Sequence, residues 1–399
     1  MSATAGDLIV ERPEGLYCPP GDFYIDPWRP VPRAVITHAH ADHARRGHGA
    51  YLATAISAGV LRARLGDITL QGLAYGETVQ VQGVTISLHP AGHVLGSAQV
   101  RVEHGGRVWV ASGDYFVSGA ASGASSEAVS GDVGGAPGGH TDEHNATCAP
   151  FEPLRCDCFI TESTFGLPIY RWAPQASVMA DINAWWQANA DVGRTSLLLG
   201  YSFGKAQRML AGVDASIGPI YVHGAVELLN EAYRAAGVAL PATQKLDARD
   251  KALDLRRALV VAPPAVQGSA WARKLGDCSD AFASGWMQLR GARRRHGVDR
   301  GFVLSDHADW PGLQRAIAAT GAERVIVTHG YEAVMVRWLT DQGLQAGSFS
   351  TEYGTQDEEV PAAATVDSAA VGADAADVAA DAVADVAAGA PPAAPACDT

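Results

Sequence analysis

Cysteine is scarce in this sequence of 399 residues, with six in all and no CxxC pair among them. So sparse a set does not build a disulfide framework, and it indicates a reducing environment. Long apolar runs are also missing, and none approaches the roughly 20 residues that a membrane-spanning helix needs. The first residues have neither the basic start nor the apolar core of a signal peptide. We therefore expect a cytoplasmic protein.

Positive charge is the third shortage, because 30 Lys and Arg residues face 43 Asp and Glu residues, for a formal net charge of −13. The excess acid is concentrated in residues 118–147 and 355–399, which contain no Lys or Arg. Outside these two stretches the formal charges balance. The acidity therefore does not exclude a polyanionic substrate.

The same two stretches are predicted to be appendages of a globular body. Residues 118–147 are rich in Gly, Ser and Ala and are expected to form a flexible loop. Residues 355–399 are mostly Ala, Asp and Val, and such a tail cannot bury enough apolar surface to offset the entropy of ordering it. We expect this tail to be disordered.

Between the appendages, short apolar runs alternate with helical patterns. The predicted strands are residues 34–37, 85–88, 108–111, 158–161, 196–200 and 324–328, and the clearest helices are residues 181–190 and 311–320. Strands interleaved with helices indicate an α/β fold.

The residues most suited to chemistry follow the first predicted strand, in the motif HAHADH. Three imidazoles and one carboxylate, from His38, His40, Asp42 and His43, fall within six residues. Capping of the next helix would explain Asp42 but not three histidines. This spacing therefore predicts a metal site.

Further ligand candidates follow other predicted strands, each beside a glycine that lets the backbone turn. They are His93, Asp114 and His329. Strand ends are where α/β folds place their sites. Five histidines and two aspartates are too many ligands for one tetrahedral ion, so we expect two divalent ions sharing a carboxylate. This nitrogen and oxygen set favours Zn²⁺, with Mn²⁺ as the alternative.

The motif at 38–43, followed by His93 and Asp114, resembles the metallo-β-lactamase fold. Three later motifs resemble the β-CASP nucleases of that fold: TESTFG with Glu162, SDHAD with His307, and THG with His329. The resemblance implies a four-layer αββα sandwich from residues 10–166 and 303–354. It also implies an inserted β-CASP α/β domain at residues 167–302, which forms a lid. The activity implied is hydrolysis of nucleic-acid phosphodiesters at two metal ions.

The resemblance also implies roles by position. His38, His40 and His93 would hold one metal, Asp114 would bridge, and Asp42, His43 and His329 would complete the second. Asp26 matches an acidic residue that orients a ligating histidine, although an ordinary Asp-Pro turn explains it too. His307, oriented by Glu162, would act as general acid or stabilise the oxyanion.

Two features point to different substrates. The run at residues 148–172 resembles bacterial exonucleases associated with ATP-dependent DNA ligases, which implies a DNA exonuclease in repair, with a ligase and a helicase as partners. A histidine in the third motif is instead commoner among RNA enzymes of the family, and His329 occupies that place. The alternatives to a DNA exonuclease are an RNA-processing nuclease of the same fold and a non-catalytic scaffold subunit.

Two basic segments are candidates for binding the substrate. Residues 199–208 resemble a phosphate loop, but Ala206 replaces the magnesium-binding hydroxyl and the glycines are one residue too close, so we do not expect ATP hydrolysis. A strand followed by Ser202, Gly204 and Lys205 could still bind a phosphate at the start of a helix; a plain strand–helix junction is the alternative. Arg293 and Arg294 lie in a dense basic run that could contact phosphates or form a solvated helix face.

Overall fold

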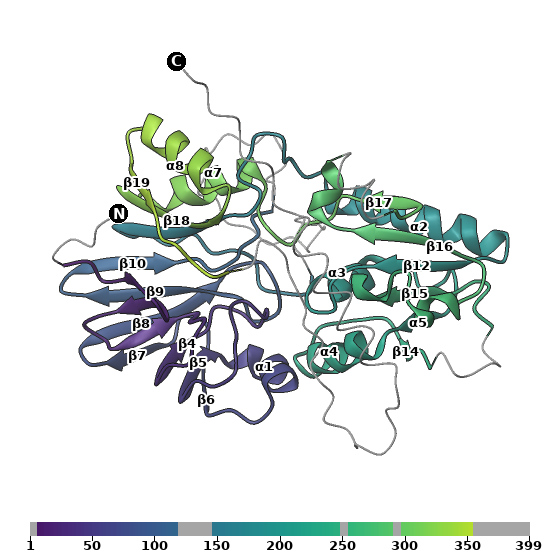
Figure 1. Cartoon of the computed structure of the whole chain (residues 1–399), viewed down its shortest axis with the longest axis horizontal. Coiled ribbons are helices and arrows are strands. Elements are labelled where there is room, and N and C mark those ends of the chain that lie inside the picture. The colour runs from purple at the N-terminus through teal and green to yellow at the C-terminus, as the bar shows by residue number, and fades with distance from the viewer. Residues whose placement is uncertain (1–5, 119–145, 248–253, 290–296, 354–399) are drawn as a thin grey trace, which may run out of the picture.

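The computed structural model describes residues 6–118, 146–247, 254–289 and 297–353. Three β-sheets and the helices around them form a mixed α/β architecture (Figure 1). None of the helices in these ranges has both the length and the hydropathy of a transmembrane segment.

The first sheet contains the six N-terminal strands in chain order. They are β1 (Val10–Arg12), β2 (Gly15–Cys18), β3 (Phe23–Ile25), β4 (Arg33–Val35), β5 (Ala50–Thr54) and β6 (Leu70–Leu73). The strands β1 to β3 form an antiparallel meander, and β3 to β6 are parallel. Because β3 and β4 are parallel neighbours, their carboxyl ends lie side by side.

The second sheet has seven strands in the order β19-β18-β11-β10-β9-β8-β7. They are β7 (Thr78–Val81), β8 (Val84–Pro90), β9 (Ala98–His104), β10 (Arg107–Ala111), β11 (Cys158–Ser163), β18 (Arg324–Gly330) and β19 (Gln345–Ser348). The strands β7 to β10 are antiparallel, whereas β10, β11, β18 and β19 are parallel. The strands β8, β10, β11 and β18 therefore end at the same edge.

These two sheets pack face to face, and helices cover their outer faces. Alternate side chains point between the sheets, such as Ile25 and Val35 from the first and Ile86 and Val100 from the second, and all are at most 2% exposed. The helix α1 (Ala58–Leu65) packs on the outside of the first sheet, together with α4 (Gly224–Ala235). The helices α7 (Trp310–Thr320) and α8 (Glu332–Asp341) pack on the outside of the second. The layers thus follow the order helix, sheet, sheet, helix (Figure 1).

The third sheet lies beside this sandwich and is wholly parallel, in the order β14-β13-β15-β12-β16-β17. Its strands are β12 (Thr195–Leu199), β13 (Ile220–Val222), β14 (Gln244–Lys245), β15 (Leu259–Ala262), β16 (Cys278–Ala283) and β17 (Arg300–Phe302). The helices α2 (Gln175–Asp191), α3 (Lys205–Gly212) and α4 cover one face, and α5 (Ala270–Arg273) lies on the other. Short 3₁₀ turns occur at Ala55–Ser57, Pro264–Val266 and Gly285–Gln288.

The structure confirms the predicted α/β class and the predicted strands, since each of the six apolar runs lies in or overlaps a strand of the sheets. Both predicted helices are present, as α2 and α7, although α2 begins six residues earlier than its pattern indicated. The predicted tail at 355–399 lies outside the described residues, as does the predicted loop at 118–147 apart from residues 118, 146 and 147. The proposed division into two domains stays a prediction.

Candidate metal centre

The predicted metal ligands gather where strands of the two packed sheets end. They are His38, His40, Asp42 and His43 after β4, His93 after β8, Asp114 after β10 and His329 in β18, and Asp26, predicted to orient one of the histidines, lies beside them after β3. The apolar strands bury the backbone up to these positions, and the loops that follow turn the polar side chains toward one another. The structure therefore brings together residues that are up to three hundred positions apart in the sequence.

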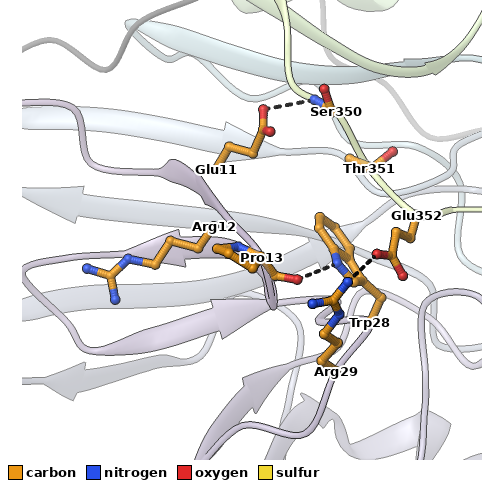
Figure 2. Close-up of a pocket in the computed structure, with 8 residues that line it drawn as sticks. All are labelled: Glu11, Arg12, Pro13, Trp28, Arg29, Ser350, Thr351 and Glu352. Carbon is orange, nitrogen blue, oxygen red and sulfur yellow. Dashed lines mark hydrogen bonds and ion pairs between the residues drawn. The ribbon is translucent and has the colours of Figure 1, made fainter.

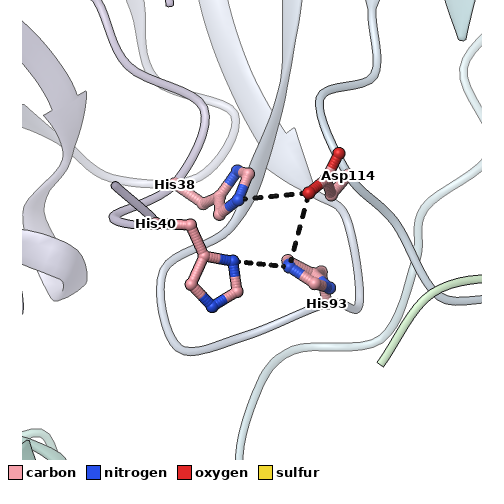
Figure 3. A group of neighbouring side chains, drawn as sticks. All are labelled: His38, His40, His93 and Asp114. Carbon is pink, nitrogen blue, oxygen red and sulfur yellow. Dashed lines mark hydrogen bonds and ion pairs between the residues drawn. The ribbon is translucent and has the colours of Figure 1, made fainter. Parts of the chain in front are cut away.

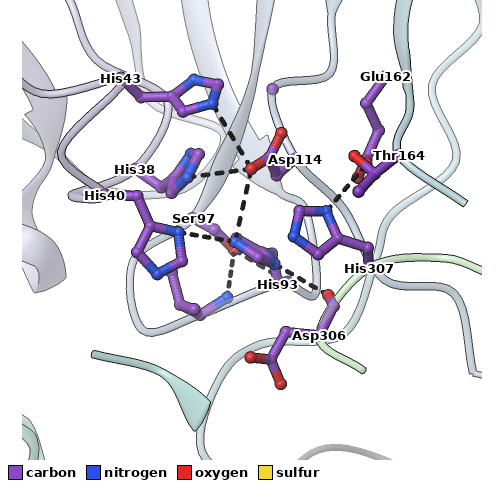
Figure 4. Close-up of polar contacts among 12 residues, drawn as sticks. His38, His40, His43, His93, Ser97, Asp114, Glu162, Thr164, Asp306 and His307 are labelled. Carbon is purple, nitrogen blue, oxygen red and sulfur yellow. Dashed lines mark hydrogen bonds and ion pairs between the residues drawn. The ribbon is translucent and has the colours of Figure 1, made fainter. Parts of the chain in front are cut away.

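Asp114 lies at the centre of the cluster and is 3% exposed. Its Oδ2 atom is 3.4 Å from His38 Nε2 and 3.5 Å from His43 Nε2 (Figure 4). The same oxygen is 3.8 Å from His93 Nε2 (Figure 3). The other carboxylate oxygen, Oδ1, is 3.2 Å from His329 Nε2. One carboxylate thus faces two sets of imidazoles, which is the arrangement that a bridging ligand requires.

His40 and His93 give a direct indication that the first set suits a cation. His93 Nδ1 donates a hydrogen bond to the Asp306 carbonyl at 2.9 Å, and His40 Nε2 donates to the Phe203 carbonyl at 3.3 Å. In neutral imidazoles these bonds leave His93 Nε2 and His40 Nδ1 without protons, yet the two atoms are only 3.1 Å apart (Figure 3). Two lone pairs facing each other at this distance repel unless a positive ion lies between them. The ligand atoms of His38, His40, His93 and Asp114 all lie within 4.8 Å of one another.

The second set is held by Asp26. Its Oδ2 atom is 2.8 Å from His43 Nδ1, and its Oδ1 accepts a hydrogen bond from the Thr37 amide at 2.7 Å. Asp26 is 1% exposed and has a φ of 42°, so the turn directs its carboxylate inward. His43 Nε2 is thereby left to face Asp114 and His329, and the three ligand atoms lie within 4.8 Å of one another. The Asp42 carboxylate lies 3.6 Å from the same nitrogen of His43 and is partly exposed.

The buried nitrogens of the cluster have the character of metal ligands. Neither His38 Nε2 nor His43 Nε2 makes a hydrogen bond within the described ranges. Burial and the neighbouring His43 hold the pKa of His38 well below its usual value, and burial and His307 lower the pKa of His93 to about 3. Both imidazoles are therefore neutral, the form that binds metals. The residues present therefore fit the binding of borderline divalent metal.

Charge also favours cations at the centre. Burial lowers the pKa of His43, but Asp114, Asp42 and Asp26 together outweigh it and raise the pKa to about 10. Burial raises the pKa of the Asp114 carboxyl, but His43 and His307 outweigh it and hold the pKa well below its usual range. Several carboxylates around one buried nitrogen thus stabilise positive charge here.

Glu162 and His307 form a pair beside the cluster. Glu162 Oε2 is 2.9 Å from His307 Nδ1, and its Oε1 accepts a hydrogen bond from the Tyr115 amide at 2.7 Å. The Thr164 hydroxyl also donates to Oε2 (Figure 4). The His307 ring lies against the His93 ring, with centroids 4.6 Å apart. Glu162 therefore orients His307 toward the metal ligands.

The predicted substrate-binding residues have mixed positions. Ser202 and Lys205 are buried, and the Lys205 ammonium is 2.9 Å from the Asp306 carboxylate. Gly204 caps α3 with a φ of 82° and packs against Val94, where a side chain would collide. The Lys205 ammonium is thus engaged by an internal anion in this structure. Arg293 and Arg294 lie outside the described residues.

Sequence reasoning did not identify Tyr353 as part of this site. Its ring stacks on the His43 imidazole, with centroids 4.4 Å apart and an interplanar angle of 20°, and its edge contacts Trp28. Trp28 also lines a cavity of about 310 Å³ that the Arg29–Glu352 ion pair crosses (Figure 2). No motif marks Tyr353, which follows the last strand and reaches His43 only through the fold.

Comparison with known proteins adds four findings. No protein-family model matches the chain. The chain is 30% identical over 340 residues to a probable DNA ligase of Opitutus terrae; the match covers 84% of this chain but only 30% of the ligase. It is 25% identical over 145 residues, 36% of this chain, to the endoribonuclease YSH1 of Yarrowia lipolytica, of which it covers 14%. A crystal structure of a protein of unknown function from Enterococcus faecalis matches with a TM-score of 0.50 and 12% identity, over 81% of this chain and 80% of that one, so the two share a fold.

Proposed function

We propose that this chain is a metal-dependent nuclease that hydrolyses phosphodiester bonds of nucleic acid. The observation that carries the proposal is the buried cluster in which two sets of ligands share Asp114 beside the Glu162–His307 pair. A shared carboxylate supports two ions, and a separate imidazole supports proton transfer. Both features contribute to phosphodiester hydrolysis at a two-metal site.

In this proposal His38, His40 and His93 would hold one ion, Asp42, His43 and His329 would hold the second, and Asp114 would serve both. Zn²⁺ suits the nitrogen-rich set best, and Mn²⁺ is the alternative. When bound, such a pair supplies an activated water and positive charge for the phosphate oxygens. Orientation of the histidines and proton transfer are assigned to the side chains of the protein.

Three side chains have these roles. Asp26 accepts the Nδ1 proton of His43, which fixes the tautomer and leaves Nε2 for the metal. Glu162 accepts the Nδ1 proton of His307 in the same way, so that His307 Nε2 faces the reaction. From there a protonated His307 gives its proton to the leaving oxygen or stabilises the charge that develops on the phosphate.

The architecture and one relative support a finer assignment. The helix–sheet–sheet–helix order supports a metallo-β-lactamase sandwich, and the separate parallel sheet supports an inserted β-CASP lid at residues 167–302. The similarity to a probable DNA ligase supports DNA as the substrate and action together with a ligase. Exonucleolytic cleavage in repair and a helicase partner are implied by the resemblance of residues 148–172 alone. All of these are proposals, because the chain spans 30% of that ligase.

RNA is the second candidate substrate. The similarity to an endoribonuclease favours it, as does the histidine at position 329. A non-catalytic scaffold is the third reading, and the intact ligand cluster argues against it because scaffolds have no need to retain every ligand.

The experiment that tests the proposal compares labelled single-stranded DNA and RNA of one sequence, with Zn²⁺ or Mn²⁺ and with a chelator. Metal-dependent shortening of DNA with release of nucleotides is the expected result, and His38→Ala should abolish it. His104→Ala is the matched control, because His104 bonds to the Gly83 carbonyl in a hairpin away from the cluster. Cleavage of RNA alone would reassign the substrate, and cleavage of neither would refute the nuclease.

A further inference from the structure

The carboxylate of Asp306 is held by two cations of the neighbouring α/β unit. Lys205 Nζ lies 2.9 Å from Asp306 Oδ2, and Arg208 Nη1 lies 3.0 Å from Asp306 Oδ1. All three residues are buried, with Lys205 3%, Arg208 1% and Asp306 4% exposed. Lys205 and Arg208 are three residues apart in α3, so they lie on the same face of the helix.

The two cations also hold the backbone of the same loop. Lys205 donates to the Leu304 carbonyl at 3.0 Å, and Arg208 donates to the Ser305 carbonyl. Arg208 is fixed in turn by Gln175, which accepts from its Nε at 2.8 Å. Three consecutive residues, 304–306, are thus bound to α3, and the next residue is His307.

This loop controls two groups of the metal centre. The Asp306 carbonyl accepts the hydrogen bond of His93 Nδ1 at 2.9 Å, and the Asp306 carboxylate points away from His93 toward α3 (Figure 4). The His307 amide donates to Ser305 Oγ at 3.0 Å, while its ring is held by Glu162 at 2.9 Å. A shift of residues 304–306 would therefore move both the Asp306 carbonyl, which orients His93, and His307, the candidate acid.

The arrangement does not suit a site for an external phosphate. A buried carboxylate already occupies the position that an anion would take, and it is paired with both Lys205 and Arg208. A buried ion pair of this kind is strongly disturbed when one partner is removed, which makes it suited to fixing a geometry.

We propose that Lys205 and Arg208 are positioning residues, through which the α/β unit containing α3 fixes the Asp306 carbonyl against His93 and the His307 ring against Glu162. Only the catalytic consequence of this proposal rests on the proposed nuclease function. The consequence for metal binding follows from the His93 contact alone.

The test uses Lys205→Met in the full chain. This variant removes one cation and leaves Arg208 paired with Asp306, so the buried site keeps one positive and one negative charge. Loss of a partner that orients a metal-binding histidine typically weakens metal affinity or activity by about 10–100-fold. We expect Zn²⁺ affinity, measured by competition with a chromophoric chelator, to fall by about 10-fold. On DNA, kcat should fall in the same range while KM and its salt dependence stay unchanged.

Two further variants complete the design. Lys205→Gln keeps a donor for Asp306 without the charge, and it should weaken Zn²⁺ binding in the same direction by less; it replaces Lys205→Met if that variant does not fold. Arg256→Met is the control, because Arg256 pairs with Asp254 on the exposed surface of the same unit. It should bind Zn²⁺ and turn over DNA like the unmodified chain.

The outcomes separate the possible errors. Unchanged Zn²⁺ affinity in both Lys205 variants would overturn the proposal. If KM rises and the salt dependence flattens while Zn²⁺ affinity is kept, Lys205 contacts substrate phosphate and the positioning role is wrong. If the unmodified chain cleaves neither DNA nor RNA but the Zn²⁺ affinity falls as expected, the nuclease proposal fails and the positioning role stands.

Discussion

At the scale of single residues, hydrogen-bonded partners determine which nitrogen of each histidine is left for a metal. In His40, His43 and His93, one ring nitrogen donates its proton to a carbonyl or carboxylate oxygen. The other ring nitrogen of each faces Asp114 or another histidine. The same device orients His307, whose partner is Glu162. Because these partners differ from residue to residue, substitutions at this scale should separate metal binding from proton transfer.

His40→Ala should lower metal content and activity together. The change removes one of two facing nitrogens and leaves His93 Nε2 without its neighbour at 3.1 Å. Elemental analysis of the purified unmodified chain should give about two ions per molecule, as a two-metal site requires, and the variant should give fewer. A metal content of one or none in a fully active protein would contradict the two-ion assignment.

His307→Ala should leave metal content and DNA binding nearly normal while turnover falls. Proton transfer by a positioned side chain contributes about 10²–10⁴-fold, so kcat should drop by that factor. Single-turnover cleavage together with elemental analysis measures both quantities. Loss of metal from this variant would instead make His307 a ligand, consistent with its closeness to Asp114 and Glu162.

Glu162→Gln should give a smaller loss of turnover in the same direction, because the amide still occupies the space but no longer stabilises a protonated His307. The same single-turnover assay measures it. A loss larger than that of His307→Ala would show that Glu162 does more than orient the imidazole.

At the scale of elements, the candidate metal centre depends on strands of two sheets whose ends lie close together. This part was predictable from sequence, because apolar runs followed by a glycine and a polar residue mark strand ends; Asp114 and His329 illustrate it. The contacts of Arg208 with Asp306 were not predictable, since they join residues 98 positions apart through the packing of α3. Lys205 was identified as part of an anion site, but sequence alone could not reveal that an internal carboxylate lies beside it.

Gly330→Ala tests how the end of β18 places His329. Gly330 has a φ of 89°, and an added Cβ would collide with the backbone of Ser163, the last residue of β11, and of Thr164, which follows it. Gly343→Ala is a matched control, because Gly343 has a φ of 85° with nothing within 4 Å of the added atom. Both variants carry a left-handed backbone cost of about 1–2 kcal/mol in the free energy of unfolding.

Urea denaturation should therefore show a larger loss of stability for Gly330→Ala than for Gly343→Ala, and only the former should weaken Zn²⁺ binding. Equal losses in the two variants would mean that the neighbouring backbone yields, and that β11 and β18 do not fix His329 in this way.

At the scale of the whole molecule, the metal centre lies where the sandwich and the third sheet's unit meet. The backbone carbonyl of Phe203 reaches His40, and Lys205 and Arg208 reach Asp306, all from the loop after β12 and from α3. The sequence motifs indicated a site within the sandwich with the second unit as a lid, but the contacts that Phe203, Lys205 and Arg208 make depend on long-range packing that no local pattern encodes. The two acidic stretches, in contrast, carry none of the predicted ligands.

Removing residues 358–399 should accordingly leave the chemistry intact. The deleted segment carries eight acidic residues and no Lys or Arg, and it begins after Tyr353, which stays in place against His43. Like charges repel a polyanion over about a Debye length, roughly 8–10 Å near physiological salt. Turnover should therefore stay within a few-fold of the full chain, and DNA should bind more tightly at low salt, with the difference fading as salt rises. A truncated protein that folds and binds Zn²⁺ normally but cleaves nothing would show instead that the tail takes part in the reaction.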